Sequence, residues 1–341
     1  MSTDFPSFSF DRLPIAETVP QACTICPLWR RLVAFLIDSF VLGLFGAVLG
    51  AFFFDTLSQL GSVGRLIGFL ITVPYFAVME SNAGSGQSLG KLLLDIKVVD
   101  ARGKLLPFEQ SFLRYVVFSA PLFLNGTPLP LRTPWVVLTL MGIIVLGVGG
   151  GTLYLLLFNR NSRQGLHDLA VGSYVVRAGT AGPVETRPIW KIHWAILGFL
   201  LLACAAMVAF FVHKMNQWER FPQLMQDMEL ILPMGNVQDV RAREPQLISG
   251  PGDRTRKVLV IEVSWTGTRA DEEAFANQVA RIILRNDPKI QAYDVLSIGI
   301  TRGYNIGIAS AWTSERIAHS PAEWSQRLSG NSPAEDATPP Q

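Results

Sequence analysis

Long apolar stretches separated by polar segments dominate the first two thirds of the chain. A helix needs about 20 mostly apolar residues to cross the roughly 30 Å hydrocarbon core of a bilayer. Four stretches are candidate spans: residues 32–54, 135–158 and 194–212 approach or exceed that length, and residues 66–79 form a shorter one. This pattern predicts an integral membrane protein.

A fifth segment, residues 112–131, is interrupted by polar and helix-breaking residues, namely Arg114, Pro121, Asn125 and Pro128. Such a segment is compatible with a broken span, a re-entrant segment or an interfacial helix. Cytoplasmic loops carry an excess of lysine and arginine, so the basic residues help to choose between these alternatives.

Basic residues gather before the first span and in two polar loops. The first loop, after residue 79, contains Lys91, Lys97, Arg102 and Lys104. The second loop, after residue 158, contains Arg160, Arg163, Arg177, Arg187 and Lys191. Placing both loops in the cytoplasm requires residues 112–131 to cross as well. The charges therefore favour five spans, with the N-terminus inside and the C-terminal region outside.

Asp38 lies within the first apolar stretch. A carboxylate there costs roughly 2.5–3.5 kcal/mol on insertion scales, so it should be paired, neutralised or turned toward a protein interior. Arg31 lies two helical turns away, about 10 Å along the axis, which is too far for a direct ion pair. We therefore expect any basic partner on another helix, with Arg65 and Arg114 as candidates. A structural pair and an ion-coupling role both remain open for Asp38.

Glycines four residues apart recur in two of the spans, at Gly46 and Gly50 and at Gly147 and Gly151. Small residues at this spacing allow helices in lipid to approach closely. We interpret both pairs as helix-packing positions.

Composition narrows the class of function. The chain is 49% hydrophobic and 16% charged, below the roughly 25% charged residues typical of soluble domains. A net charge of +2 gives no reason to expect nucleic-acid binding. Residues 1–27 carry no early basic cluster, so we expect the first span to act as an uncleaved anchor.

The three cysteines suggest neither a metal nor a cofactor. Cys23 and Cys26 have the spacing of half a zinc site or of a redox pair, but the sequence contains no second pair. We favour chance spacing for them and a packing role for Cys204.

Two polar segments between the spans carry motifs. The first contains Gly86, Gln87, Gly90 and Lys91 in GQSLGK, followed by IKVVD at residues 96–100. The second contains Arg163, His167 and Asp168 in RQGLHD. Together with WRRLVAFLID at residues 29–38, these three motifs resemble, in order, the RDD family of bacterial membrane proteins over about residues 28–177.

The resemblance implies which residues carry the family's name. Its aspartates would be Asp38 and Asp168, and its arginine would be Arg31 or the neighbouring Arg30. The alternative interpretation, which we favour for at least one of the two arginines, is a simple cytoplasmic anchor. The family has no settled general function, although transport has been proposed for some members.

The motifs do not point to an enzyme. GQSLGK lacks the Walker pattern and no strand precedes it, which argues against nucleotide binding. His167 and Asp168 have no serine or cysteine nucleophile with a supporting motif. We expect Asp168 to cap or pair within its juxtamembrane loop.

The C-terminal region has the pattern of a small α+β domain. Residues 218–232 form an amphipathic connector and residues 237–257 a polar, loop-rich segment. A β-α-β-β order is expected after that segment. The strands would cover residues 258–265, 293–301 and 306–313, and the helix residues 268–286. A turn at residues 302–305 would join the last two strands, and residues 329–341 should be disordered.

The sequence thus predicts a helical membrane bundle followed by an α+β domain. The expected segments are a cytoplasmic tail (1–27), an RDD-like domain (28–177), a linker (178–189), a last span (190–214), an extracytoplasmic domain (215–325) and a tail (326–341). We expect a multi-pass protein of the bacterial cytoplasmic membrane.

Two functions fit this organisation. In the first, the bundle transports a small ion or solute with Asp38 facing a cavity, and the small number of spans would require a homo-oligomer. In the second, the chain is an anchor or assembly factor that binds a protein partner through residues 218–325.

Overall fold

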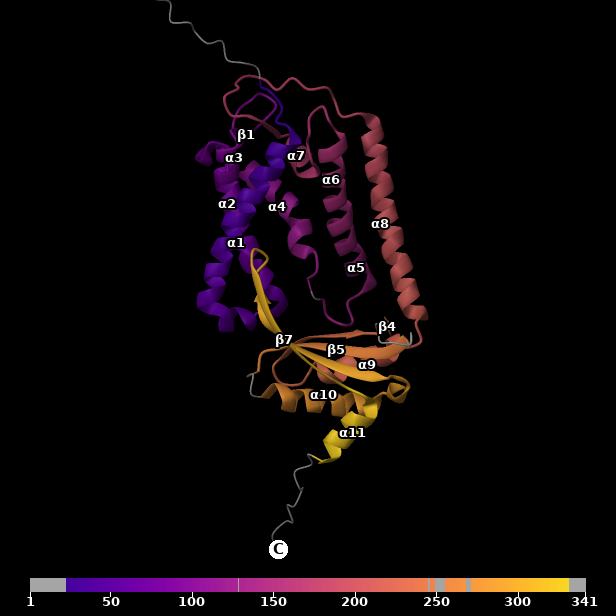
Figure 1. Cartoon of the computed structure of the whole chain (residues 1–341). Helices are drawn as coiled ribbons and strands as arrows, with labels where there is room; N and C mark the ends of the chain where they lie inside the picture. The colour runs from indigo at the N-terminus through magenta and orange to yellow at the C-terminus, as the bar shows by residue number, and fades with distance from the viewer. Residues whose placement is uncertain (1–22, 128, 245, 249–254, 268–270, 331–341) are drawn as a thin grey trace, which may run out of the picture.

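The computed structural model describes residues 23–127, 129–244, 246–248, 255–267 and 271–330 of the 341-residue chain. It confirms the predicted class, because a bundle of long apolar helices stands on a small domain built around a sheet (Figure 1). Residues 1–22 and 331–341, which include most of both predicted tails, lie outside the described residues.

Four helical segments are long and apolar enough to cross a membrane. They are α1 (Leu28–Ser58), η1 with α2 (Gly61–Met79), α5 to α6 (Trp135–Phe158) and α8 (Lys191–Gln217). In each, between 6% and 33% of the most apolar stretch is buried inside the protein. Most of this apolar surface therefore faces outward, as a lipid-exposed surface requires.

The interrupted segment forms a shorter helix than expected, α4 (Phe108–Leu124). It runs antiparallel to α2, since Phe123 packs on Phe69 with ring centroids 5.6 Å apart while Ser111 lies near Phe76. Its 17 residues span about 25 Å, slightly less than the hydrocarbon core. The helix ends seven residues before the predicted boundary because Asn125 takes an extended conformation. In Figure 1, α4 lies within the bundle beside α1 and α2 and ends before the hairpin end of these helices.

Two short strands and two short helices cover one end of the bundle, which we call the charged end. Strand β1 (Ile96–Val99) pairs antiparallel with β2 (Tyr174–Arg177), which brings the two polar motif segments together. Helices α3 (Leu89–Leu93) and α7 (Leu166–Val171) lie beside them (Figure 1). Cys23 and Cys26 are free and buried in two adjacent apolar clusters here.

The C-terminal domain lies at the opposite end, which we call the hairpin end (Figure 1). Its helices are α9 (Phe221–Ile231), α10 (Glu272–Asn286) and α11 (Pro321–Gly330). Its strands are β3 (Val237–Arg243), β4 (Gln246–Ile248), β5 (Thr255–Trp265), β6 (Val295–Asn305) and β7 (Ser310–His319). The sheet order is β3-β5-β6-β7, with β4 paired to β5. Because α10 joins β5 to β6, these two strands are parallel.

Three local predictions for this domain were wrong. Residues 237–257, expected to be loop-rich, contain β3 and β4. Helix α11 continues to Gly330, past the start of the predicted disordered tail. The hairpin turn lies at residues 306–309, because residues 302–305 still pair with β7. The turn forms where the Asn305 side chain accepts a hydrogen bond from the amide of Gly307, whose φ of +83° suits glycine.

Candidate functional site

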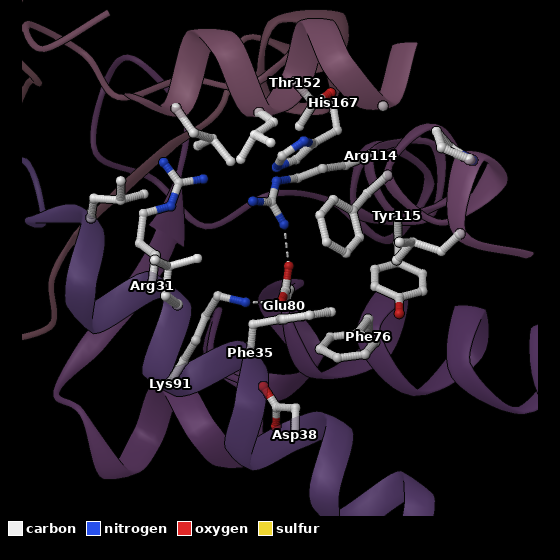
Figure 2. A pocket seen from close by; sticks show the side chains of 18 of the residues that line it. Arg31, Phe35, Asp38, Phe76, Glu80, Lys91, Arg114, Tyr115, Thr152 and His167 are labelled. Atoms are coloured by element: carbon white, nitrogen blue, oxygen red, sulfur yellow. Dashed lines mark hydrogen bonds and ion pairs between the residues drawn. The ribbon is translucent and has the colours of Figure 1, made fainter. Parts of the chain in front are cut away.

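A cavity of about 390 Å³ lies inside the bundle near its charged end. Helices α1, α4 and α6 (Gly149–Phe158) supply much of its lining. Most of the wall is apolar, including Phe35, Phe118, Leu122 and Leu153. Charged side chains gather on one part of the wall, and they are Arg31, Asp38, Glu80, Lys91 and Arg114 (Figure 2).

Asp38 is fully buried on this wall and is held by neutral donors. The Tyr75 hydroxyl donates to Oδ1 over 3.0 Å and the amide of Gly90 donates to the same oxygen over 2.8 Å. The Ser88 hydroxyl donates to Oδ2. Among the described residues, no basic side chain forms an ion pair with Asp38. Its carboxylate is therefore fixed in place by hydrogen bonds without being neutralised by a cation.

Arg114, a candidate partner of Asp38, is instead the centre of an ion network. Its guanidinium contacts Asp168 through Nε at 2.9 Å and through Nη2 at 2.7 Å, and it also bonds to Glu80. Lys91 binds the other oxygen of Glu80, as Figure 2 shows. Arg31 completes the network with a 2.6 Å ion pair to Asp168.

The network joins elements that are far apart in the sequence. Arg31 comes from α1, Lys91 from α3, Arg114 from α4 and Asp168 from α7, while Glu80 directly follows α2. All five are at least half-buried, and breaking a buried pair leaves an uncompensated charge that costs several kcal/mol. The ion pairs therefore fix the relative positions of these elements at the charged end.

Burial and neighbouring charges shift the pKa values of Asp168 and His167 at this end. Burial alone would raise the pKa of Asp168, but the charges of Arg31 and Arg114 hold that pKa well below its usual range. Burial lowers the pKa of His167 to about 3, so its imidazole is neutral near pH 7. Asp168 also accepts the amide of Gly165 over 3.1 Å and so caps α7.

The two candidate arginines of the family motif have different partners in the structure. Arg31 contacts Asp168, whereas Arg30 donates to the carbonyl of Leu94 over 3.1 Å and lies over the Trp29 ring. Arg65, considered as a partner of Asp38, instead bonds to the carbonyl of Asn125 near the hairpin end.

The motif residues at the charged end fix the backbone of the two polar segments through hydrogen bonds and close packing. Gly86 has a φ of +73° and its carbonyl accepts the amide of Val98 over 2.8 Å. Gln87 donates from its side chain to the carbonyl of Ile96 over 3.0 Å. Gly90 allows close approach, because a Cβ there would overlap the backbone of Ala34 in α1. Arg163 offers its carbonyl to Arg31, at a φ of +52°.

Sequence reasoning missed three residues of the site: Tyr75, Ser88 and Glu80. Tyr75 and Ser88 are neutral donors, and such donors have no distinctive pattern in a sequence. Glu80 did have a signal, since an acidic residue directly at the end of an apolar span is costly unless it is paired. The described residues contain no group of three or more His, Cys, Asp or Glu that could hold a metal.

One of the comparisons with known proteins found a match, which is to a protein family. The model of the RDD family matches residues 25–172, the part that contains the cavity, Asp38 and the ion network. The comparison with curated proteins found no match to the chain, and the comparison with solved structures also found none.

Proposed function

We propose that the segment matching the RDD family model, residues 25–172, binds and moves a small cation across the membrane, with Asp38 as its binding carboxylate. The observation that carries the proposal is the difference between Asp38, Glu80 and Asp168, the three buried carboxylates in the described part of the bundle. Glu80 and Asp168 each contact two basic side chains, whereas Asp38 contacts only neutral donors.

The surroundings of Asp38 suit such a role. An intramembrane carboxylate on a cavity wall is by default a functional candidate. The hydroxyl oxygens of Tyr75 and Ser88 adjoin it, so a proton or a small monovalent cation would find three oxygen-bearing groups together. The fixed ion network keeps the helices around this site in place.

The charge distribution supports an orientation. The basic loops lie at the charged end, and Arg30 bonds there to the carbonyl of Leu94. We therefore propose that this end is cytoplasmic and that the C-terminal domain is outside. The match to the RDD family model supports our proposal of the bacterial cytoplasmic membrane as the location. Because one bundle of this size is small for a carrier, we further propose that the transporting unit is a homo-oligomer.

Cation–proton exchange in proteoliposomes tests the proposal. Asp38→Asn retains an oxygen acceptor for Tyr75 and Gly90, so the protein should fold while flux is lost. The matched control is Asp95→Asn, because Asp95 is exposed and its φ of +53° is one that asparagine adopts readily. Equal flux in the wild type and in folded Asp38→Asn would remove Asp38 from the mechanism.

One observation favours a second candidate function, a non-enzymatic assembly role. Strand β7 is at the edge of the sheet, its side chains are largely exposed, and Trp312 on it is 51% exposed. An edge strand can pair with a strand of another protein. A stoichiometric partner that co-purifies with the wild type and is lost in Trp312→Ala, together with an absence of flux in all variants, would support this role.

A further inference from the structure

The tip of the β6–β7 hairpin lies inside the membrane bundle, although it belongs to the C-terminal domain. In Figure 1 the hairpin rises from the sheet alongside α1. Three glycines of α1 face it. A Cβ at Gly43 would lie 3.5 Å from the carbonyl of Ile308, and one at Gly46 would lie 2.8 Å from the Ile308 side chain. A Cβ at Gly50 would overlap the Tyr304 hydroxyl.

The other neighbouring helices enclose the same tip. At Gly68 of α2, a Cβ would overlap the carbonyl of Ile306, and at Gly64 it would lie 3.0 Å from the carbonyl of Asn305. Phe123 of α4 lies so close to Gly307 that a side chain at this position would overlap its ring. The hairpin therefore occupies a groove whose glycines leave room for its backbone.

The tip points toward the Asp38 cavity. Ile308 packs against a cluster formed by Leu42, Val73, Phe76 and Tyr115. Phe76 and Tyr115 also line the cavity, and Leu42 lies one helical turn from Asp38. One layer of side chains thus separates the hairpin from the cavity that contains Asp38.

The contacts that hold the tip can form and break more easily than the ion network. Within the described part of the chain, no hydrogen bond joins residues 306–309 to the bundle, and the tip is held by apolar packing. The polar contacts lie at the rim of the groove. There, Arg302 pairs with Asp55 at 2.6 Å, and Gln238 donates to the carbonyl of Ser58 over 2.8 Å. The Asp55 side chain is 77% exposed, so its ion pair contributes little.

We propose that the β6–β7 hairpin is the gate on the C-terminal-domain side of the Asp38 site. Seated as in this structure, it closes the site from that side. Withdrawal of Ile308 from its apolar cluster opens the site, so that the C-terminal domain controls access. This inference rests on the proposed cation site, because it assigns a role to the hairpin in reaching Asp38.

The first test measures access and needs no transport. Leu42→Cys places a thiol directly behind Ile308, and a membrane-impermeant maleimide is added from the C-terminal-domain side. Ile308→Asp puts a charge into the apolar cluster and should unseat the hairpin, whereas Ile308→Leu conserves volume and should leave it seated. We expect at least tenfold faster labelling of Leu42→Cys with Ile308→Asp than with Ile308→Leu. The same variants at Ile308 without Leu42→Cys measure the background labelling of the native cysteines.

Equal labelling of the two double variants, with both proteins folded by size-exclusion chromatography, would overturn the gate. Ile308 lies outside the core of the C-terminal domain, so that domain should fold in both variants.

The second test separates failure of the gate from failure of the cation proposal. Gly46→Cys with Ala309→Cys brings two thiols together, since a Cβ at Gly46 would lie 2.9 Å from that of Ala309. A disulfide needs a Cβ–Cβ separation of about 3.8 Å, so the hairpin must move slightly outward, which also relieves the contact with Ile308. We expect oxidation to abolish flux and reduction to restore it. Flux that persists in the oxidised protein would overturn the gate and leave the cation site standing. Gated labelling without flux in any protein would retain the gate and reject the cation site.

Discussion

The two ends of the bundle are held together in opposite ways. At the charged end, Arg31, Glu80, Lys91, Arg114 and Asp168 join five elements through directional ion pairs. At the hairpin end, glycines on α1 and α2 face the backbone and side chains of the hairpin, and the contacts are mostly apolar. Ion pairs in a buried site are costly to break, whereas apolar packing against a hairpin lets the hairpin leave as a unit. The difference suggests a fixed end and a movable end, with Asp38 between them.

The substitution with the largest expected effect on stability, Asp168→Asn, tests whether the charged end is the fixed end. Asp168→Asn removes the charge that pairs with Arg31 and Arg114 and leaves both cations less compensated. We expect the free energy of unfolding to fall by about 3–5 kcal/mol. Thermal unfolding in detergent micelles measures the change, with the exposed Asp95→Asn as the matched control. A loss below about 1 kcal/mol would mean that the network does not fix this end.

Acid should reduce the stability that the ion pairs of Asp168 contribute to the folded protein. The pKa of Asp168 lies below its ordinary value of 3.8, so the folded protein holds the charged form more strongly than the unfolded chain does. This stabilisation is complete above about pH 4 and is lost as the pH falls toward the native-state pKa. The stability difference between wild type and Asp168→Asn should therefore shrink on acidification below about pH 4.

The next prediction compares the stability lost when each of two adjacent arginines is replaced by alanine. Arg31→Ala loses the ion pair with Asp168 and the bond to the carbonyl of Arg163. Arg30→Ala loses one hydrogen bond to the carbonyl of Leu94 and a contact with Trp29. We expect Arg31→Ala to cost about 2–3 kcal/mol and Arg30→Ala under about 1 kcal/mol by the same unfolding measurement. Equal costs would show that the two arginines are interchangeable anchors.

Much of the charged end could be predicted from the sequence, because a charge in an apolar segment is expensive and therefore conspicuous. The sequence indicated Asp38, Arg31, Arg114 and Asp168 for this reason or through the family motifs. Arg31, Arg114 and Asp168 belong to the ion network of this end, and Asp38 lies beside it on the cavity wall. Their pairing could not be predicted. Asp38 is satisfied by neutral donors, and which cation meets which carboxylate depends on how the helices pack.

The hairpin end could not be predicted, because strand patterns carry only local information. The last two strands were expected, but nothing in their alternation shows that the turn between them enters the bundle. The glycine pairs illustrate the limit. Gly147 and Gly151 pack against Leu201 and Leu197 of α8, as the helix-packing interpretation expects. Gly46 and Gly50 have the same spacing but face the hairpin, so the helix-packing interpretation was wrong for them.

The smallest expected effect asks whether the hairpin end is truly movable. In Gly68→Ala, the new Cβ would overlap the Ile306 carbonyl, so either α2 or the hairpin must shift. Gly150→Ala is the matched control, because Gly150 is also in a membrane helix and a Cβ added there would meet nothing within 4 Å. Alanine should stabilise the helix at that open site by up to about 1 kcal/mol.

For Gly68→Ala we expect a net loss of about 1–2 kcal/mol, the lower part of the range for overpacking, because a movable hairpin relieves the strain by withdrawing. The same variant should then label faster at Leu42→Cys than the Gly150→Ala protein does. A larger loss of stability with unchanged labelling would show that the hairpin is as rigidly seated as the ion network, and the contrast between the two ends would fail.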